Sequence, residues 1–285
     1  SLVLLYTRQH LMAFVWIVAL SLAFYGVKGG IFTVINGGAY KVWGPTGGYI
    51  EGNNEIGLAL VMTIPLLVFL RGTLKSRWAR WGMLGASVLC AAAALGTHSR
   101  GALLAIAAML LFLWWHSGKR MLGLVFLPVL VLGMLSFMPE HWWSRMETIQ
   151  TYEEDGSAMG RINAWWMAWN LASDRFLGGG YAIITPDLFA RYAPQPEDIH
   201  AAHSIYFMVL GEHGFVGLLL FLALFTFAFF SAGRLRKRAL LRPETQWLSQ
   251  LGAMCQVSLV GYAVGGAFLS LSYWDMPYNI VLMII

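Results

Sequence analysis

The sequence predicts an all-α polytopic integral membrane protein, a bundle of transmembrane helices with one long external loop that contains short helices. Three observations predict this class. Of the 285 residues, 58% are hydrophobic and only 12% are charged, against about 25% charged residues in a soluble domain. The mean hydropathy of the chain is +0.63. Apolar runs of nearly membrane-spanning length follow one another, and basic residues gather in some of the connections between them.

Each apolar run is a candidate transmembrane helix, because about 20 apolar residues cross the hydrocarbon core of a bilayer. The runs cover 11–27, 55–70, 81–97, 101–115, 121–138, 204–230 and 247–270, and a last one begins at 279. The fourth run is short, but its small residues allow close helix packing. We therefore expect transmembrane helices in 1–138 and 204–285, and an external subdomain in 139–203. Because the chain begins at Ser1 and stops within an apolar run, we expect both ends to be cuts.

The basic residues predict how these helices are oriented. Twelve of the 19 Lys and Arg residues and one of the 14 acidic residues fall on one side, which gives that side a net charge of +11. The rest give the other side −6, in agreement with the total of +5. Basic loops of membrane proteins face the cytoplasm, so 139–203 is expected on the opposite face. Membrane topology explains the basic charge, and we expect no nucleic-acid partner. Cys90 and Cys255 lie within apolar runs and indicate no redox chemistry.

The external loop contains a tryptophan-rich helical pattern. It runs from Gly160 to Leu171, and the glycines at 178–180 act as its stop signal. Trp165 and Trp169 are four residues apart and therefore share one helix face. Two interpretations stay open. The helix lies on the membrane surface and is anchored by its tryptophans, or these rings also stack on a sugar.

Two arginines at the outer face are functional candidates, because ionisable residues near a membrane core are costly and mark function. Arg100 lies between two apolar runs, where the orientation rule disfavours a cation, and beside a helix start that attracts phosphate. The alternative is an arginine that only reaches the lipid headgroups. Arg161 is expected to open the tryptophan helix, against the helix dipole, which indicates an anionic partner. The alternative partner is the acidic segment 153–155.

His203 is the third candidate and is expected at the start of the next transmembrane helix. There an imidazole can act as a general base near neutral pH. The alternative is a histidine that is only hydrogen-bonded at the interface. Gly211, Gly214 and Gly217 recur every three residues and predict a closely packed helix face.

A metal site is not expected, although His200 and His203 lie three residues apart with acids nearby. Pro186, Pro194 and Pro196 predict irregular structure over 186–200, and no metal-site spacing appears. We therefore expect no metal and no other cofactor.

These motifs resemble the O-antigen ligase and polymerase superfamily of bacterial envelope glycosyltransferases. The ligase pattern is His, then Ser, Asn or Gln, nine free positions, Gly, two free positions, then Gly, Thr or Tyr. The segment from His203-Ser204 through Gly214 to Gly217 matches it in full. Weaker matches occur in three other segments: Glu51-Gly52-Asn53-Asn54-Glu55, Ser99-Arg100-Gly101, and Gly160-Arg161 followed by the tryptophans and Leu177-Gly178-Gly179-Gly180.

The resemblance implies a GT-C-like bundle and an O-antigen ligase of lipopolysaccharide biosynthesis. The enzyme would be a multi-pass protein of the bacterial inner membrane with its active site facing the periplasm. It would move a glycan from undecaprenyl diphosphate to the lipid A–core by a metal-independent, inverting transfer. His203 would be the catalytic base, and Arg100 and Arg161 would bind the diphosphate. The further substrate-binding residues implied are Ser99, Asn54, Trp165 and Tyr181.

Other functions stay open at this point. A polymerase of the same superfamily would use another lipid-linked repeat as acceptor, and a protein O-oligosaccharyltransferase would use a Ser or Thr side chain. A more remote alternative is a transporter of lipid-linked glycans, in which buried Arg and His line a pathway. Against it, the candidate residues gather at the outer face, and no run shows a broken, charged midplane segment. A scaffold protein of an envelope complex is the last alternative.

Overall fold

The computed structural model describes residues 5–116, 136, 138–140, 142–143 and 156–285, and the regular elements in these ranges are all helices. The chain divides into two compact units, which we describe one at a time. Unit 1 consists of Ser1–Trp143, Ala228–Gly265 and Trp274–Ile285, and unit 2 consists of Ser144–Phe227 and Gly266–Tyr273. Helix α9 contributes its first part to unit 2 and its last part to unit 1.

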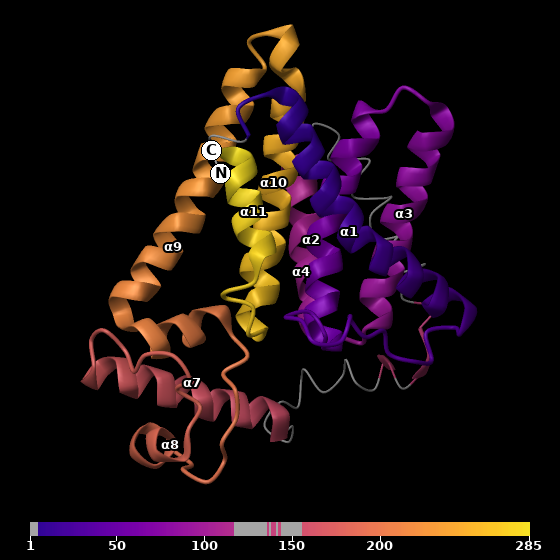
Figure 1. Ribbon diagram of the computed structural model, residues 1–285. Helices are drawn as coiled ribbons and strands as arrows, with labels where there is room; N and C mark the ends of the chain where they lie inside the picture. Colours follow the sequence, from indigo (N-terminus) through magenta and orange to yellow (C-terminus); the bar gives the residue numbers. More distant parts are fainter. Residues whose placement is uncertain (1–4, 117–135, 137, 141, 144–155) are drawn as a thin grey trace. The chain divides into compact units, whose positions relative to one another are not determined.

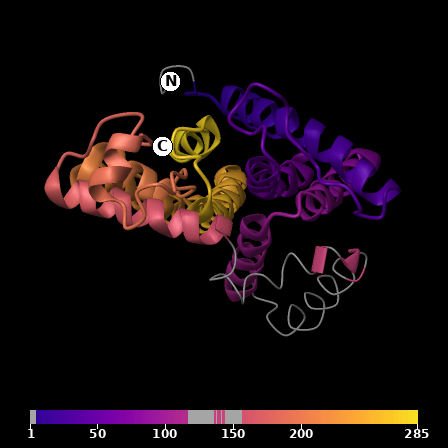
Figure 2. The ribbon, with the colours of Figure 1, turned by 90° about the horizontal axis from the view of Figure 1, so that it is seen from below.

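Unit 1 is a helical bundle built around α2. Its helices are α1 (Arg8–Ile35), α2 (Asn53–Thr73), α3 (Arg77–Gly96), α4 (Arg100–His116), the end of α9 (Ile205–Ala239), η2 (Pro243–Thr245), α10 (Gln246–Gly265) and α11 (Asp275–Ile284). Helix α2 packs against α1, α3, α4 and α10 (Figures 1 and 2). Of the most apolar stretch of α2, 72% is buried by protein, against 28% for α1, so α2 is a central helix and α1 a peripheral one.

The helices confirm the predicted all-α membrane class. Five are long and apolar enough to cross a bilayer: Arg8–Ile35, Asn53–Thr73, Arg77–Gly96, Ile205–Ala239 and Pro243–Phe268. They coincide with five of the predicted runs, and α4, with 17 residues, coincides with the short fourth run. The run 121–138 falls almost wholly outside the described residues. The last run is helical from Asp275. The chain is therefore a multi-pass membrane protein.

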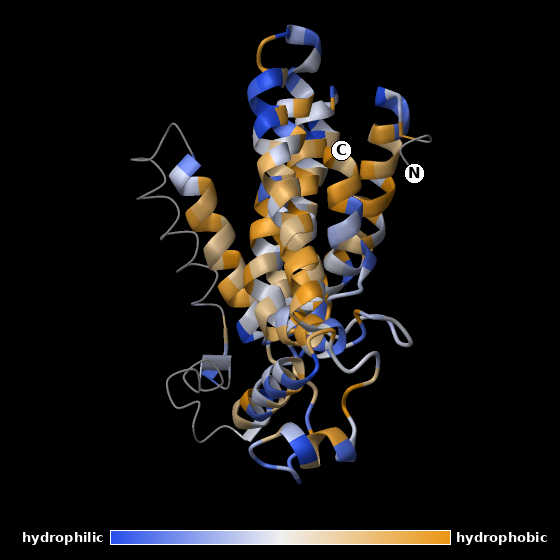
Figure 3. Ribbon diagram, turned by 90° about the vertical axis from the view of Figure 1, so that its left-hand side faces the viewer, coloured by the Kyte–Doolittle hydropathy of each residue, from blue (hydrophilic) through white to orange (hydrophobic). Residues whose placement is uncertain are grey.

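Several connections that are rich in basic residues lie at the same end of unit 1. The Arg8 guanidinium lies 5.1 Å from the centroid of the Trp247 ring, which joins the start of α1 to the start of α10. The end of α2 reaches the same place, because a Cβ on Gly72 would lie 3.3 Å from the Gln250 side chain. Hydrophilic residues cluster around the α9–α10 connection in Figure 3. Connections that the sequence assigns to the cytoplasmic side thus lie at one end of this unit.

Unit 2 packs two helices and a connecting segment around a small core. It contains α7 (Gly156–Asp174), α8 (Pro186–Tyr192), the first part of α9 and η3 (Gly266–Phe268). Its buried core residues come from α7, α8 and the segments beside them: Ala164, Met167, Leu171, Ile183, Phe189 and Ala202.

The prediction that 186–200 is irregular is wrong for its first part, which forms α8. Pro186 occupies the first turn of α8, where the missing N–H of proline costs no hydrogen bond. The Thr185 hydroxyl caps this helix by accepting from the Leu188 N–H at 3.4 Å. The tryptophan helix is also longer than predicted, because α7 begins at Gly156 and ends at Asp174.

Candidate functional site

His203 does not begin the membrane helix, as the sequence predicted, but lies two residues before it. Helix α9 starts at Ile205, and His203 has φ of +41°, a strained value for a residue with a side chain. Its imidazole Nδ1 is buried and has no hydrogen-bond partner among the described residues. The fold therefore holds this ring in a special backbone conformation with one nitrogen left unengaged.

The surroundings of His203 favour its neutral form. Burial lowers the pKa of His203 below its usual value of 6.5, and the positive charge of Arg161, with a contribution from His200, lowers it further. A neutral imidazole at physiological pH carries a free lone pair and can accept a proton. Unit 2 thus brings a base and a guanidinium into electrostatic range of each other.

Arg161 reaches this position from the second turn of α7, not from its first residue. Because α7 begins at Gly156, the prediction that Arg161 opens the helix is wrong, and the helix dipole gives no reason for an anionic partner. The alternative partners in 153–155 lie outside the described residues. The proximity of Arg161 to His203 is the stronger indication of a role.

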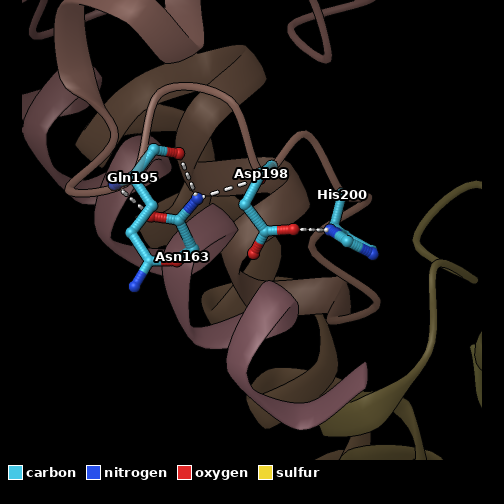
Figure 4. A network of polar contacts seen from close by, with 4 residues as sticks. All are labelled: Asn163, Gln195, Asp198 and His200. Atoms are coloured by element: carbon cyan, nitrogen blue, oxygen red, sulfur yellow. Dashed lines mark hydrogen bonds and ion pairs between the residues drawn. The ribbon is translucent and has the colours of Figure 1, made fainter. Parts of the chain in front are cut away.

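Asn163, two residues after Arg161, fastens the segment that leads to His203 (Figure 4). Its side-chain amide donates to the Gln195 carbonyl at 2.8 Å and to the Asp198 carbonyl at 2.9 Å. Its side-chain oxygen accepts from the Gln195 N–H at 2.9 Å. The Asp198 carboxylate in turn lies 2.8 Å from His200 Nδ1. These contacts hold the segment 195–200 against α7, because both amide hydrogens and the oxygen of the buried Asn163 side chain are bonded to it.

Two further residues of α7 complete this attachment. A Cβ on Gly160 would lie 2.6 Å from His200 Nδ1, so only glycine leaves room for that ring. The Trp165 indole N–H donates to the Ala202 carbonyl at 2.6 Å, and the ring stacks on Phe207 at 4.9 Å between centroids. One face of the Trp165 ring is therefore covered by Phe207. The sugar-stacking and membrane-anchoring roles of the tryptophans stay predictions.

The other predicted site residues, Arg100, Ser99 and Asn54, lie in unit 1. Arg100 is half-buried and is the first residue of α4, one residue before the predicted helix start. The buried Ser99 hydroxyl caps this helix by accepting from the Ala102 N–H at 3.2 Å. Asn54 is half-buried in the first turn of α2. The meeting of Arg100 with Arg161 and His203 around one diphosphate stays a prediction.

The turn that carries Ser99 and Arg100 is held in place by polar contacts. The Asn53 side-chain amide donates to the Thr97 carbonyl at 2.8 Å. The buried His98 ring donates from Nε2 to the Gly38 carbonyl at 2.9 Å. The backbone of His98 has φ of +56°. Buried side chains therefore satisfy backbone carbonyls in and beside this turn, as Asn163 does in the segment before His203.

Gly214 does not continue a packed helix face, as its spacing predicted, but breaks α9. Its φ of 65° and ψ of −164° are non-helical. The break leaves backbone groups without their helical partners, and the segment 176–180 pairs with them. Gly179 and Gly180 each donate an N–H at 2.9 Å to the carbonyls of Gly211 and Glu212, and Phe215 N–H donates to the Phe176 carbonyl at 3.1 Å. The glycine loop at 178–180 and the break at Gly214 are thus joined by backbone hydrogen bonds.

A polar and aromatic cluster beside this break was missed by sequence reasoning. It consists of Tyr181, Glu212, His213 and Tyr273, all in unit 2. Only Tyr181 was predicted as a site residue. The available signal was Glu212, an acidic residue inside an apolar run, which by itself indicates function. Within the described ranges, metal-binding side chains do not gather in groups of three or more.

The comparisons with known proteins gave one match. A family model described as O-antigen ligase matches residues 85–222. The matched region includes Arg100, Arg161, Tyr181 and His203, and it supports assignment to the O-antigen ligase superfamily. Neither the search of curated proteins nor the search of solved structures gave a significant match.

Proposed function

We propose, on the premise that this chain belongs to the O-antigen ligase superfamily, that it is an O-antigen ligase of the bacterial inner membrane. It transfers a glycan from undecaprenyl diphosphate to the lipid A–core, with its active site on the periplasmic side. The observation that carries the proposal is that unit 2 holds the His203 imidazole close enough to Arg161 for the guanidinium charge to lower the pKa of His203, in addition to the effect of burial. A base and an anion-binding cation are the two groups that such a transfer needs.

The proposed reaction is a direct displacement at the anomeric carbon of the donor sugar. An acceptor hydroxyl forms the new glycosidic bond while the bond to the diphosphate breaks, with inversion at the anomeric carbon. The hydroxyl proton goes to the imidazole of His203, a ring that is half-buried and whose pKa is lowered by burial and by the charge of Arg161. The electron pair leaves with the diphosphate.

The leaving diphosphate gains negative charge as its bond breaks, and cations stabilise that charge most strongly where water is excluded. Arg161 fills this role in unit 2, and Arg100 is proposed as a second cation for the diphosphate. A guanidinium binds phosphate oxygens through two parallel hydrogen bonds, which orients the group as well as neutralising it. The proposed transfer is therefore metal-independent.

A reconstituted transfer assay tests the function. Purified protein in lipid vesicles is supplied with undecaprenyl diphosphate that carries a glycan, with and without lipid A–core. A glycan attached to the lipid A–core, formed only when that acceptor is present, is the expected result. Extension of the lipid-linked glycan without lipid A–core would make the protein a polymerase, and movement of the donor across the bilayer without a new glycosidic bond would make it a transporter.

A further inference from the structure

Glu212 is an acidic residue inside α9, and its carboxylate is the first member of a hydrogen-bonded chain of three side chains, Glu212, Tyr273 and His213, which we call the relay. Only 6% of Glu212 is exposed. The Tyr273 hydroxyl donates to Glu212 Oε2, and the same hydroxyl lies 2.9 Å from His213 Nε2. An ionisable residue in a membrane helix is retained for function and is paired with a partner. Here the partner is a tyrosine that also reaches a histidine.

The hydrogen bonds of Tyr273 indicate which ring nitrogen of His213 carries a hydrogen. A phenol has one hydrogen to donate, and Tyr273 gives it to the Glu212 carboxylate. Its oxygen then accepts from His213 Nε2, an arrangement that in the neutral ring leaves Nδ1 with its lone pair. The hydrogen bond of this ring to the tyrosine runs through Nε2, so Nδ1 points away from that contact. The relay therefore presents a hydrogen-bond acceptor on a half-buried ring.

Aromatic rings surround that acceptor. The Tyr181 ring centroid lies 5.1 Å from that of His213 and 5.9 Å from that of Tyr273. Tyr181 is 74% exposed, so its ring is accessible to a ligand. Apolar ring surface beside a few fixed polar groups is the composition of a small-ligand site. A pyranose fits this chemistry, since it offers C–H groups to the rings and hydroxyl hydrogens to Nδ1.

The backbone on either side of Tyr181 has an unusual conformation that a hydrogen bond helps to hold. Tyr181 stands between Gly180, with φ of +81°, and Ala182, with φ of +61°. The Gly180 N–H is bound to the carbonyl of Glu212, the first residue of the relay. Strained backbone held by hydrogen bonds is typical of ligand sites, because a pre-organised site loses less entropy on binding.

We propose that Tyr181, His213 and Tyr273, oriented by Glu212, form a carbohydrate subsite that binds a sugar of the transferred glycan. It rests on the proposed function and adds to it a second point of contact with the substrate. His213 lies eight residues beyond the start of α9, which is about 12 Å along a helix, so the sugar held there is not the one that reacts at His203. The subsite selects glycans of suitable length and hydroxyl pattern.

The test compares two lipids as probes. One is undecaprenyl diphosphate that carries a repeat unit of the host's surface glycan, and the other is bare undecaprenyl diphosphate. The proteins are the wild type, Tyr181→Ala, His213→Ala and Tyr273→Phe, each in detergent with its unfolding midpoint recorded. Tyr192→Phe is the matched control, because Tyr192 lies in unit 2, donates its hydroxyl to Asp174 and takes no part in the cluster.

Each subsite variant is expected to weaken binding of the glycan-bearing lipid by about three- to tenfold, the effect of one hydrogen bond or ring contact. Binding of bare undecaprenyl diphosphate and the control Tyr192→Phe should stay within about twofold. Tyr273→Phe keeps its ring, so a loss in that variant reports the relay. Equal loss of both lipids, or no loss of either, would overturn the subsite. A wild-type protein that binds neither lipid would instead overturn the proposed function.

Discussion

Gly178 and Gly214 approach so closely that neither can carry a side chain. A Cβ on Gly178 would lie 2.5 Å from the Gly214 nitrogen, and a Cβ on Gly214 would lie 2.6 Å from the Gly178 nitrogen. Both have positive φ, +80° and +65°. The break in α9 and the glycine loop therefore require each other.

We expect Gly214→Ala to destabilise the protein, because the new Cβ would also meet the Phe176 carbonyl oxygen at 2.0 Å. A strained backbone alone costs about 1–3 kcal/mol, and the clash adds to it. The thermal unfolding midpoint in detergent measures this. Gly48→Ala is the control, since a Cβ there meets nothing within 4 Å. Equal midpoints for the two variants would show that the break tolerates a side chain.

His203→Ala is expected to abolish glycan transfer and to leave the protein folded, because it removes the proton acceptor from a half-buried position. Product formation in the vesicle assay and the unfolding midpoint are measured together. The exposed His10, replaced by Ala, serves as control. Transfer near the wild-type rate in His203→Ala would remove this residue from the mechanism.

The pH dependence of transfer is expected to reflect the lowered pKa of His203. The base is active when neutral, so activity should fall only at pH values below 6.5, as the ring gains its proton. Arg161→Gln removes a positive charge that disfavours protonation, so the pKa of His203 rises and the acid limb moves to higher pH. The profile of kcat/KM against pH measures this shift separately from any loss of diphosphate binding. An acid limb that stays in place would mean that His203 does not govern it.

Arg100→Lys is expected to keep only part of the activity. Lysine retains the charge but loses the paired hydrogen bonds of the guanidinium, and one charge-assisted bond corresponds to about a 10- to 100-fold change in rate. Steady-state rates at saturating acceptor measure it. The exposed Arg175, changed to Lys, is the control. Full activity of Arg100→Lys would show that the guanidinium does not bind the diphosphate and that Arg100 only helps to orient the membrane helices.

Asn163→Ala is expected to reduce transfer by releasing the segment before His203, since three hydrogen bonds are lost. A positioning role predicts a shift of the acid limb as well as a lower rate, because the burial of His203 changes. Asn170→Ala, which removes one exposed bond to the Tyr192 carbonyl, is the control on the same helix. A lower rate with an unmoved pH profile would reduce Asn163 to a purely stabilising residue.

Helices of the bundle could be predicted from the sequence because lipid demands long apolar runs. The run at 55–70 lies within α2, and the run at 81–97 lies within α3 except for its last residue. The pattern around His203 located a half-buried imidazole near Arg161. It did not show that His203 precedes the helix or that Gly214 breaks it, because both depend on hydrogen bonds from distant segments. Tyr273 lies 61 residues from Glu212, and no local periodicity connects them.

Helix α2 has consequences for how sequences of this kind can diverge. With protein on most sides, positions such as Leu58, Leu60 and Leu67 have no exposed surface, so size and shape constrain them more than apolar character does. Positions such as Ile17 and Phe24 of α1 stay largely exposed, where any lipid-soluble side chain serves. A library of random substitutions should therefore tolerate exchanges among apolar residues along α1 and reject the same exchanges along α2.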